Sequence, residues 1–158
     1  MLKVAERIKI RRASAGDFED AMTLYQELVG NIPLPKGDAA EERWSAILAH
    51  AGTTVIAAEL DSRMVAFATL HIMPNMTFGG RPYALIENVV TLEASQGVGI
   101  GSLIMKASIE EAWAHDAYKI MLLTGKKFGV KAFYEKLGFT GDEKHGMTLR
   151  RAPSRRPD

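Results

Sequence analysis

The spacing of apolar side chains changes several times along the chain, and these changes predict alternating strands and helices. Residues 8–11 alternate apolar and basic side chains, as a short strand does. Apolar residues then recur every three or four positions over 17–29, after the helix-starting signals Ser14 and Asp17, and predict an amphipathic helix. A loop with two prolines separates it from a second predicted helix over 38–50.

The middle of the chain is rich in β-branched and apolar residues, which is typical of strands. Residues 53–60 and 64–72 flank a short polar stretch at 61–63, and we expect them to form a hairpin. Residues 83–92 are mostly apolar on both faces, as expected for a strand at the centre of a sheet. A glycine-rich stretch follows, and then a helix is predicted to about Asp116.

The last part of the chain shows weaker patterns. A buried-type strand is predicted over 119–124, a short helix over 129–137, and one or two strands from Phe139 to near Arg150. Strands and helices therefore mix along the whole sequence, which predicts an α/β fold.

Composition favours one globular domain. The chain has 158 residues, of which 47% are hydrophobic and 25% charged, and these values are ordinary for a domain with a packed core. Neither an internal repeat nor a linker rich in proline, glycine or serine divides it. We expect a single domain over 8–150 with flexible termini at 1–7 and 151–158.

Charge and cysteine content narrow the functional classes. The formal net charge of +1 gives no basic field of the kind that marks nucleic-acid binders, so no nucleic-acid partner is expected. The absence of cysteine removes disulfides and cysteine nucleophiles and fits a cytoplasmic protein. No apolar run is long enough to predict a membrane span, and no pair of the four histidines has metal-ligand spacing, so no metal is predicted.

The stretch from Gln96 to Gly101 carries the clearest chemical signal. It lies between a predicted strand and a predicted helix, and it contains three glycines. Glycines let backbone N–H groups approach a ligand closely, and the start of a helix attracts anions, most often phosphate. This context predicts a cofactor that bears phosphate groups.

Three nucleotide-binding motifs fail at this loop. A P-loop would need Lys after Gly101, where Ser102 stands. The dinucleotide fingerprint matches Gly97 and Gly99, but its third glycine position is Ser102, and the loop lies past the middle of the chain. The partner motifs of a kinase glycine loop are absent from the sequence. The pattern that remains is Q-x-x-G-x-G, formed by Gln96, Gly99 and Gly101.

This pattern resembles the pyrophosphate loop of the GNAT (Gcn5-related) N-acetyltransferases. The stretch IENVVTLEASQGVGIGSLIMKASIEEAW is similar to that family's central strand, loop and helix, and AFYEKLGF, at 132–139, is similar to its closing helix and strand. The resemblance extends in element order over 8–150. It implies a mixed, mostly antiparallel sheet of six to seven strands flanked by about four helices, with acetyl-CoA as cosubstrate.

The resemblance also implies where acetyl-CoA binds. Backbone groups of Val89, Val90 and Thr91 would hold the pantetheine arm and the acetyl carbonyl. The residues that would wrap the pyrophosphate are Gln96, Gly97, Val98, Gly99, Ile100, Gly101 and Ser102.

Two residues are candidates for catalysis. Glu87 interrupts a mostly apolar strand, where burial would raise the pKa of its carboxyl toward that of a useful base; the alternative is a structural carboxylate bonded to a neighbour. Family members often hold a glutamate there that deprotonates the amine. Tyr134 matches the family tyrosine that protonates the departing thiolate; the alternative is a core residue, because Phe133 and Leu137 share its helical face.

We therefore expect an N-acetyltransferase that moves acetyl from acetyl-CoA to an amine by direct attack in a ternary complex, since no cysteine is present to form an acyl-enzyme. The acceptor would be a small-molecule or peptide amine, and a homodimer is a candidate assembly. The alternatives are a non-catalytic acyl-CoA-binding sensor or regulatory module on the same fold, and a different nucleotide-binding protein. Candidate acceptor contacts are Asn31, Glu41, Glu42 and Arg43.

Overall fold

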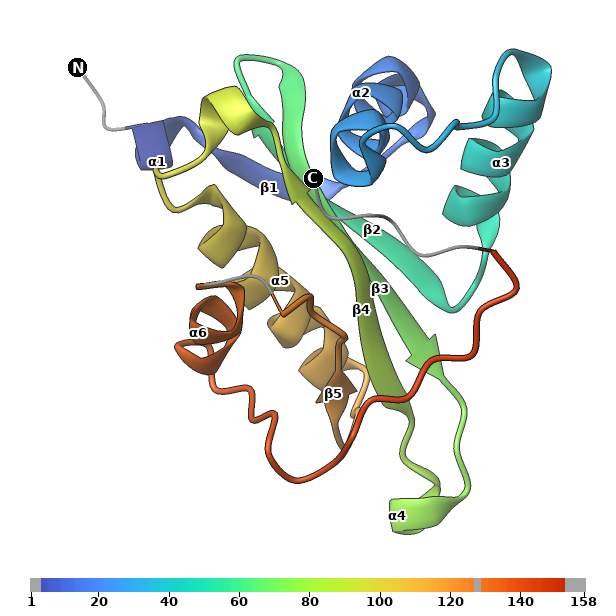
Figure 1. Ribbon diagram of the computed structural model, residues 1–158, viewed down its shortest axis with the longest axis vertical. Coiled ribbons are helices and arrows are strands. Elements are labelled where there is room, and N and C mark those ends of the chain that lie inside the picture. The colour runs from blue at the N-terminus through green and yellow to red at the C-terminus, as the bar shows by residue number, and fades with distance from the viewer. Residues whose placement is uncertain (1–3, 127–128, 153–158) are drawn as a thin grey trace. The chain divides into compact units, whose positions relative to one another are not determined.

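The computed structural model describes residues 4–126 and 129–152 (Figure 1), and the chain divides into two compact units between Leu122 and Leu123. The second unit contains the short helix α6 (Val130–Glu135). The elements of the first unit are α1 (Val4–Arg7), β1 (Lys9–Arg12), a 3-10 turn (Ala15–Asp17), α2 (Phe18–Val29), α3 (Asp38–Ala49), β2 (Thr53–Leu60), β3 (Arg63–Met73), α4 (Thr77–Gly80), β4 (Tyr83–Thr91), a second 3-10 turn (Glu93–Ser95), α5 (Ile100–Ala114) and β5 (Ile120–Met121).

The sheet has five strands in the order β1-β2-β3-β4-β5. The first four strands pair antiparallel, and β4 pairs parallel with β5. Asp61 and Ser62 form the turn between β2 and β3, and both have positive φ (50° and 64°), as tight hairpin turns favour. The predicted α/β class, the mixed and mostly antiparallel sheet, and the hairpin are confirmed.

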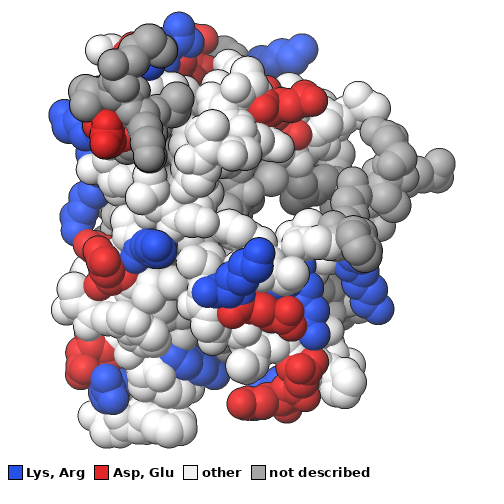
Figure 2. All heavy atoms as spheres, turned by 90° about the vertical axis from the view of Figure 1, so that its left-hand side faces the viewer, with Lys and Arg blue, Asp and Glu red and all other residues white. Residues whose placement is uncertain are grey.

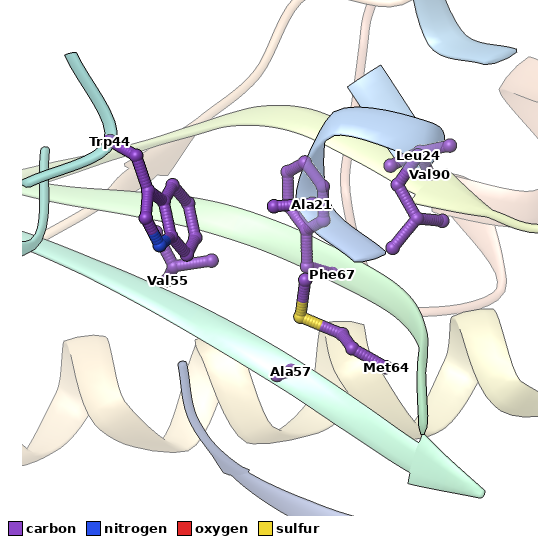
Figure 3. Packing of buried hydrophobic residues seen from close by; sticks show 8 residues of the cluster. All are labelled: Ala21, Leu24, Trp44, Val55, Ala57, Met64, Phe67 and Val90. Atoms are coloured by element: carbon purple, nitrogen blue, oxygen red, sulfur yellow. The ribbon is translucent and has the colours of Figure 1, made fainter. Parts of the chain in front are cut away.

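A hydrophobic core fills the space between one face of the sheet and the helices α2 and α3 (Figure 3). Leu24 of α2 and Phe67 of β3 are completely buried, and Tyr25 packs edge-on against the Phe67 ring at a centroid distance of 4.8 Å. Each such buried side chain contributes about 1.5–3 kcal/mol by leaving water. The buried members of this core are Ala21, Leu24, Trp44, Val55, Ala57, Met64, Phe67 and Val90.

Helix α5 packs against the sheet on the side opposite α2 and α3 (Figure 1). Strand residues alternate between the two faces, so both faces of β2 and β3 are buried, and these strands are therefore almost continuously apolar. The buried residues of α5 are Ile100, Ile104, Met105, Ser108 and Ala112. Trp113, near the C-terminal end of α5, is 52% exposed.

The strands predicted in the last part of the chain differ from those in the structure. The strand expected over 119–124 is limited to Ile120–Met121, and the described residues 139–152 contain no strand. The sheet therefore has five described strands in place of six to seven. Met147 and Leu149, apolar residues at alternate positions of this segment, are 91% and 101% exposed, so neither packs in a core.

The terminal segments predicted as flexible lie partly outside the described residues, at 1–3 and 153–158. The single domain over 8–150 stays a prediction. On the face drawn in Figure 2, acidic and basic side chains are interspersed. Such mixing gives no single-sign field to attract a polyanion to this face.

Arg11 joins the start of α2 to the sheet. Its guanidinium donates two hydrogen bonds to the Asp17 carboxylate, at 2.8 and 2.7 Å, and one to Glu59 Oε2 at 2.6 Å. The Ser14 backbone N–H also donates to Asp17, at 2.7 Å. The hydrogen bonds from Arg11 are the main cause that lowers the pKa of Asp17 below its usual value, and the bond from Ser14 adds to it. Burial acts in the opposite direction and raises this pKa.

We predict that Asp17→Asn lowers the free energy of unfolding by about 2 kcal/mol at neutral pH, because a nearly buried charge-assisted hydrogen-bond network is broken. The contribution of Asp17 is present above the unfolded-state pKa of about 3.9 and is lost as pH falls through the lower folded-state pKa. Urea unfolding of both proteins between pH 7 and pH 2 measures this difference.

The matched control is Asp142→Asn, since the Asp142 side chain is 85% exposed in its ion pair with Lys131 and should contribute little. A difference between wild type and Asp17→Asn that stays constant down to pH 2 would contradict the role given to the ionised carboxylate.

Candidate active site

A β-bulge reshapes β4 next to the candidate base. The register with β3 passes from Thr69 opposite Glu87 to Phe67 opposite Val90, so β4 has one extra residue there. Asn88 lies in this bulge with φ of 53°, a left-handed conformation that asparagine tolerates better than most residues. Because of the extra residue, Glu87 and Val90 point to the same face. Val90 packs in the α2–α3 core, so Glu87 also faces the α2–α3 side.

The outer edge of β4 is open beyond the bulge. β4 pairs with β5 only at Ala84–Ile120 and Leu85–Met121. Among the described residues, the part of β4 from Ile86 to Thr91 has no partner strand on this side. Unpaired N–H and C=O groups of an edge strand can bind an extended ligand. The predicted pantetheine contacts at 89–91 lie on this edge, and since the Val90 side chain is buried, only its backbone is available.

The predicted pyrophosphate loop has the backbone conformation that its glycines favour. Gly97 and Gly99 have φ of 79° and 88°, and Gly99 precedes the first residue of α5. A Cβ atom on either residue would meet nothing within 4 Å, so their conformation, and not local crowding, calls for glycine. Gln96 Nε2 donates to the Thr91 carbonyl oxygen at 3.0 Å and ties the loop to the end of β4.

The start of α5 fits an anion. The first N–H groups of a helix have no acceptor within the helix, which here concerns Ile100, Gly101 and Ser102. The first turn has no acidic residue that would neutralise the positive end of the helix dipole. Val98 is 42% exposed beside them. All seven predicted loop residues therefore lie in one segment suited to bind phosphate groups.

Glu87 is half-buried beside polar and aromatic groups on the α2–α3 side of the sheet. Thr69, its partner across the strands, is buried, and Thr69 Oγ1 makes no hydrogen bond of normal geometry within the described part of the chain. The phenol of Tyr25 lies near that hydroxyl. Burial raises the pKa of Tyr25, and the approach of Thr69 partly offsets the rise. A buried hydroxyl thus lies directly across from the candidate base, with a partly buried phenol near that hydroxyl.

A cavity of about 180 Å³ lies between α2, α3 and the loop that joins them. Tyr25 belongs both to its lining and to the surroundings of Thr69. Arg43 is its only charged lining residue and forms no ion pair with any residue that the structure describes. Of the four candidate acceptor contacts, Arg43 lines this cavity, and Asn31, Glu41 and Glu42 do not.

Tyr134 lies on α6 in the second unit. Its ring packs edge-on against Phe133 and Phe139, at centroid distances of 5.0 and 6.1 Å. Burial raises the pKa of its phenol, so the group is protonated throughout the neutral range, as a general acid must be. This aromatic packing also accords with the alternative role in a core.

Sequence reasoning missed the bulge and the cavity. The identity of Asn88 is the one local signal for the bulge, since asparagine is enriched at positive φ.

Among the residues that the structure describes, no group of three potential ligands is arranged to hold a metal ion. No described helix has the length and apolar character to cross a membrane.

Comparisons with known proteins agree with this geometry. Residues 18–139 match the model of the acetyltransferase (GNAT) family. Glucosamine 6-phosphate N-acetyltransferase of Trypanosoma brucei brucei is 31% identical over 137 residues, which are 87% of this chain and 92% of that protein. A crystal structure described as "Putative acetyltransferase" from Agrobacterium tumefaciens str. C58 is 42% identical, with a TM-score of 0.86 over 90% of this chain and 99% of that one. An aminoglycoside N-acetyltransferase in complex with CoA is 18% identical and shares the fold, with a TM-score of 0.75 over 92% of this chain and 95% of that one.

The chain thus belongs to the acetyltransferase (GNAT) family. It is an acetyl-CoA-dependent N-acetyltransferase whose acceptor is an amine. The predicted family, reaction class and cosubstrate are confirmed.

We predict that Asn88→Val lowers the free energy of unfolding by about 1–2 kcal/mol, whereas Asn88→Gly is tolerated, because a β-branched residue is strained at positive φ. If the strand relieves this strain by losing the bulge, Glu87 turns to the opposite face, and turnover falls more than stability. Urea unfolding and release of free thiol from acetyl-CoA measure the two effects. Equal stability and turnover of the two variants would show that the bulge does not depend on this residue.

Proposed function

We propose that this N-acetyltransferase transfers acetyl directly from acetyl-CoA to the primary amine of a small polar acceptor within a ternary complex. The observation that carries the proposal is the position of Glu87, beside the bulge and on the strand with the open edge. A carboxylate there lies on the α2–α3 side of the sheet, where it can meet an acceptor amine. The thioester would approach it along the edge of the same strand.

Acetyl-CoA would bind in two segments. The pantetheine arm would pair with the backbone of Val89, Val90 and Thr91, since this part of β4 lacks a partner strand in the described residues. The pyrophosphate would accept hydrogen bonds from the loop Gln96–Ser102. The left-handed glycines and the dipole at the start of α5 support that placement.

The proposed reaction requires one base and one acid. Glu87 removes a proton from the amine, directly or through water, and the nitrogen attacks the thioester carbonyl carbon. A C–N bond forms and the C–S bond breaks, and Tyr134 donates its phenolic proton to the departing thiolate. The Tyr134 phenolate then regains a proton from water, and the Glu87 carboxyl releases the proton that it took, so both groups return to their starting states. The products are the N-acetyl compound and coenzyme A. The raised pKa of Tyr134 supports the acid role, because the phenol is protonated when the thiolate leaves.

Glucosamine 6-phosphate is the first acceptor to test. The support is the name of the curated relative, which is 31% identical over most of both chains. The cavity between α2 and α3 adds to it, since aromatic side chains can pack against a sugar ring and Arg43 is free to pair with a phosphate.

We predict that glucosamine 6-phosphate supports release of coenzyme A thiol with a kcat/KM at least about tenfold above that of glucosamine, because one charged contact is lost with the phosphate. Arg43→Gln should raise the KM for the phosphorylated sugar and leave that for glucosamine unchanged. A thiol-release assay with both sugars and both proteins measures this. Turnover with a peptide or polyamine alone would reject the sugar phosphate, and absence of a KM change would reject the role of Arg43.

We predict that Glu87→Gln and Tyr134→Phe each lower kcat by about a hundredfold, since a positioned base or acid contributes at least that much. Because burial raises the pKa of the Tyr134 phenol, loss of this acid should remove the fall in rate at high pH. Calorimetry should show wild-type affinity for acetyl-CoA in both variants.

Tyr118→Phe is the matched control, because Tyr118 stacks on Phe78 at 4.1 Å, away from the proposed chemistry, and should leave kcat unchanged. A wild-type kcat in Glu87→Gln, or an unaltered pH–rate profile in Tyr134→Phe, would reject the role of that residue.

A further inference from the structure

Three side chains on the α2–α3 side of the sheet form a continuous hydrogen-bonded chain. Thr53 Oγ1 lies 2.8 Å from His50 Nδ1 and 2.9 Å from His71 Nδ1. His50 caps the C-terminal end of α3, Thr53 begins β2, and His71 lies on β3. Thr53 and His71 are direct partners in the β2–β3 register, so their side chains share one face.

The inner end of this chain lies beside Glu87. Glu87 pairs with Thr69, and His71 is two residues further along β3, so His71 and Glu87 are diagonal neighbours on the same face. Such neighbours have Cα atoms roughly 7–8 Å apart, within reach of long side chains. The outer end, His50, is exposed. The three residues therefore connect the surroundings of the candidate base with solvent.

The electrostatic setting of His71 suits transfer of a proton. Burial lowers the pKa of His71 below its usual value, the charge of Glu87 opposes this, and His50 adds to it. The Tyr25 phenol of α2 also lies on this face, near Thr69. A neutral imidazole at neutral pH has one ring nitrogen that accepts a proton and one that donates.

We propose that His71, Thr53 and His50 conduct to solvent the proton that Glu87 takes from the acceptor amine. The proton moves from the Glu87 carboxyl to His71 Nε2, while the proton on His71 Nδ1 passes to Thr53 Oγ1. The hydroxyl proton of Thr53 passes to His50 Nδ1, and His50 Nε2 releases its own proton to water. Only O–H and N–H bonds form and break, and one proton enters and one leaves. Exchange with water at the exposed His50 and the half-exposed His71 then restores the starting tautomers.

Thr53 is the residue that distinguishes a proton path from a structural tie. Its hydroxyl can accept from one imidazole and donate to the other, whereas a valine of the same shape can do neither. Thr54 supplies a matched control, because the next residue of β2 points to the opposite face. A structural contact between α3 and the sheet would not need a transferable proton.

Kinetics of three variants test the path. Thr53→Val should lower kcat about tenfold, Thr53→Ser should restore most of it, and Thr54→Val should match wild type. Since proton release becomes limiting, kcat of Thr53→Val should rise with the concentration of imidazole buffer, and wild-type kcat should not. Unfolding midpoints and acetyl-CoA affinity serve to exclude general damage. A wild-type kcat in Thr53→Val, or a loss that imidazole does not relieve, would overturn the proposal.

Because the path rests on the proposed role of Glu87 as base, a second measurement uses the resting protein. ¹⁵N NMR of the histidine rings should show His50 and His71 with opposite protonation at Nδ1, and Thr53→Val should abolish that relation. If both Nδ1 atoms lack a proton, the path does not exist, whatever the kinetics of Glu87→Gln. If the two histidines have opposite tautomers but Glu87→Gln has the wild-type kcat, Glu87 is not the base. The hydrogen-bonded chain from His71 to His50 would still exist in that case.

Discussion

Asn88 holds a backbone conformation that an L-residue in a strand rarely adopts, and the arrangement of β4 follows from it. One extra residue at this point turns Glu87 to the face on which Val90 is buried. An unbroken strand would place these two side chains on opposite faces, because residues alternate. The face to which this polar side chain points therefore depends on the one-residue bulge at Asn88.

The rest of the first unit keeps that strand in place. α2 and α3 cover one face of the sheet and α5 covers the other, so β4 is held on both sides by apolar packing. Glu27 of α2 also accepts a hydrogen bond from the backbone N–H of Glu93, just after β4. A rigid support of this kind suits a transfer reaction in which positioning supplies much of the rate. The unpaired edge of β4 and the glycine loop lie next to this support.

Local pattern predicted much of the fold. The long helices and the β2–β3 hairpin begin and end within one or two residues of their predicted limits, because their apolar spacing is strong. The loop at 96–101 was also predictable, since glycine spacing after a strand is a local signal. The C-terminal strands were wrong because Met147 and Leu149 supply apolar character without a surface to cover. The bulge and the Thr53–His71 contact depend on strand register, which pairs residues 18 positions apart and leaves no trace in composition.

The open edge of β4 also affects how molecules of this protein can associate with one another. A row of unpaired backbone donors and acceptors is a template on which a strand of another molecule can add, and proteins usually protect such edges. Here the pantetheine arm of the cosubstrate would occupy the part of this row at 89–91 during turnover. Acetyl-CoA would thereby act as a removable edge strand. The empty enzyme would be the form most prone to self-association, and its solubility would follow the supply of the acetyl donor.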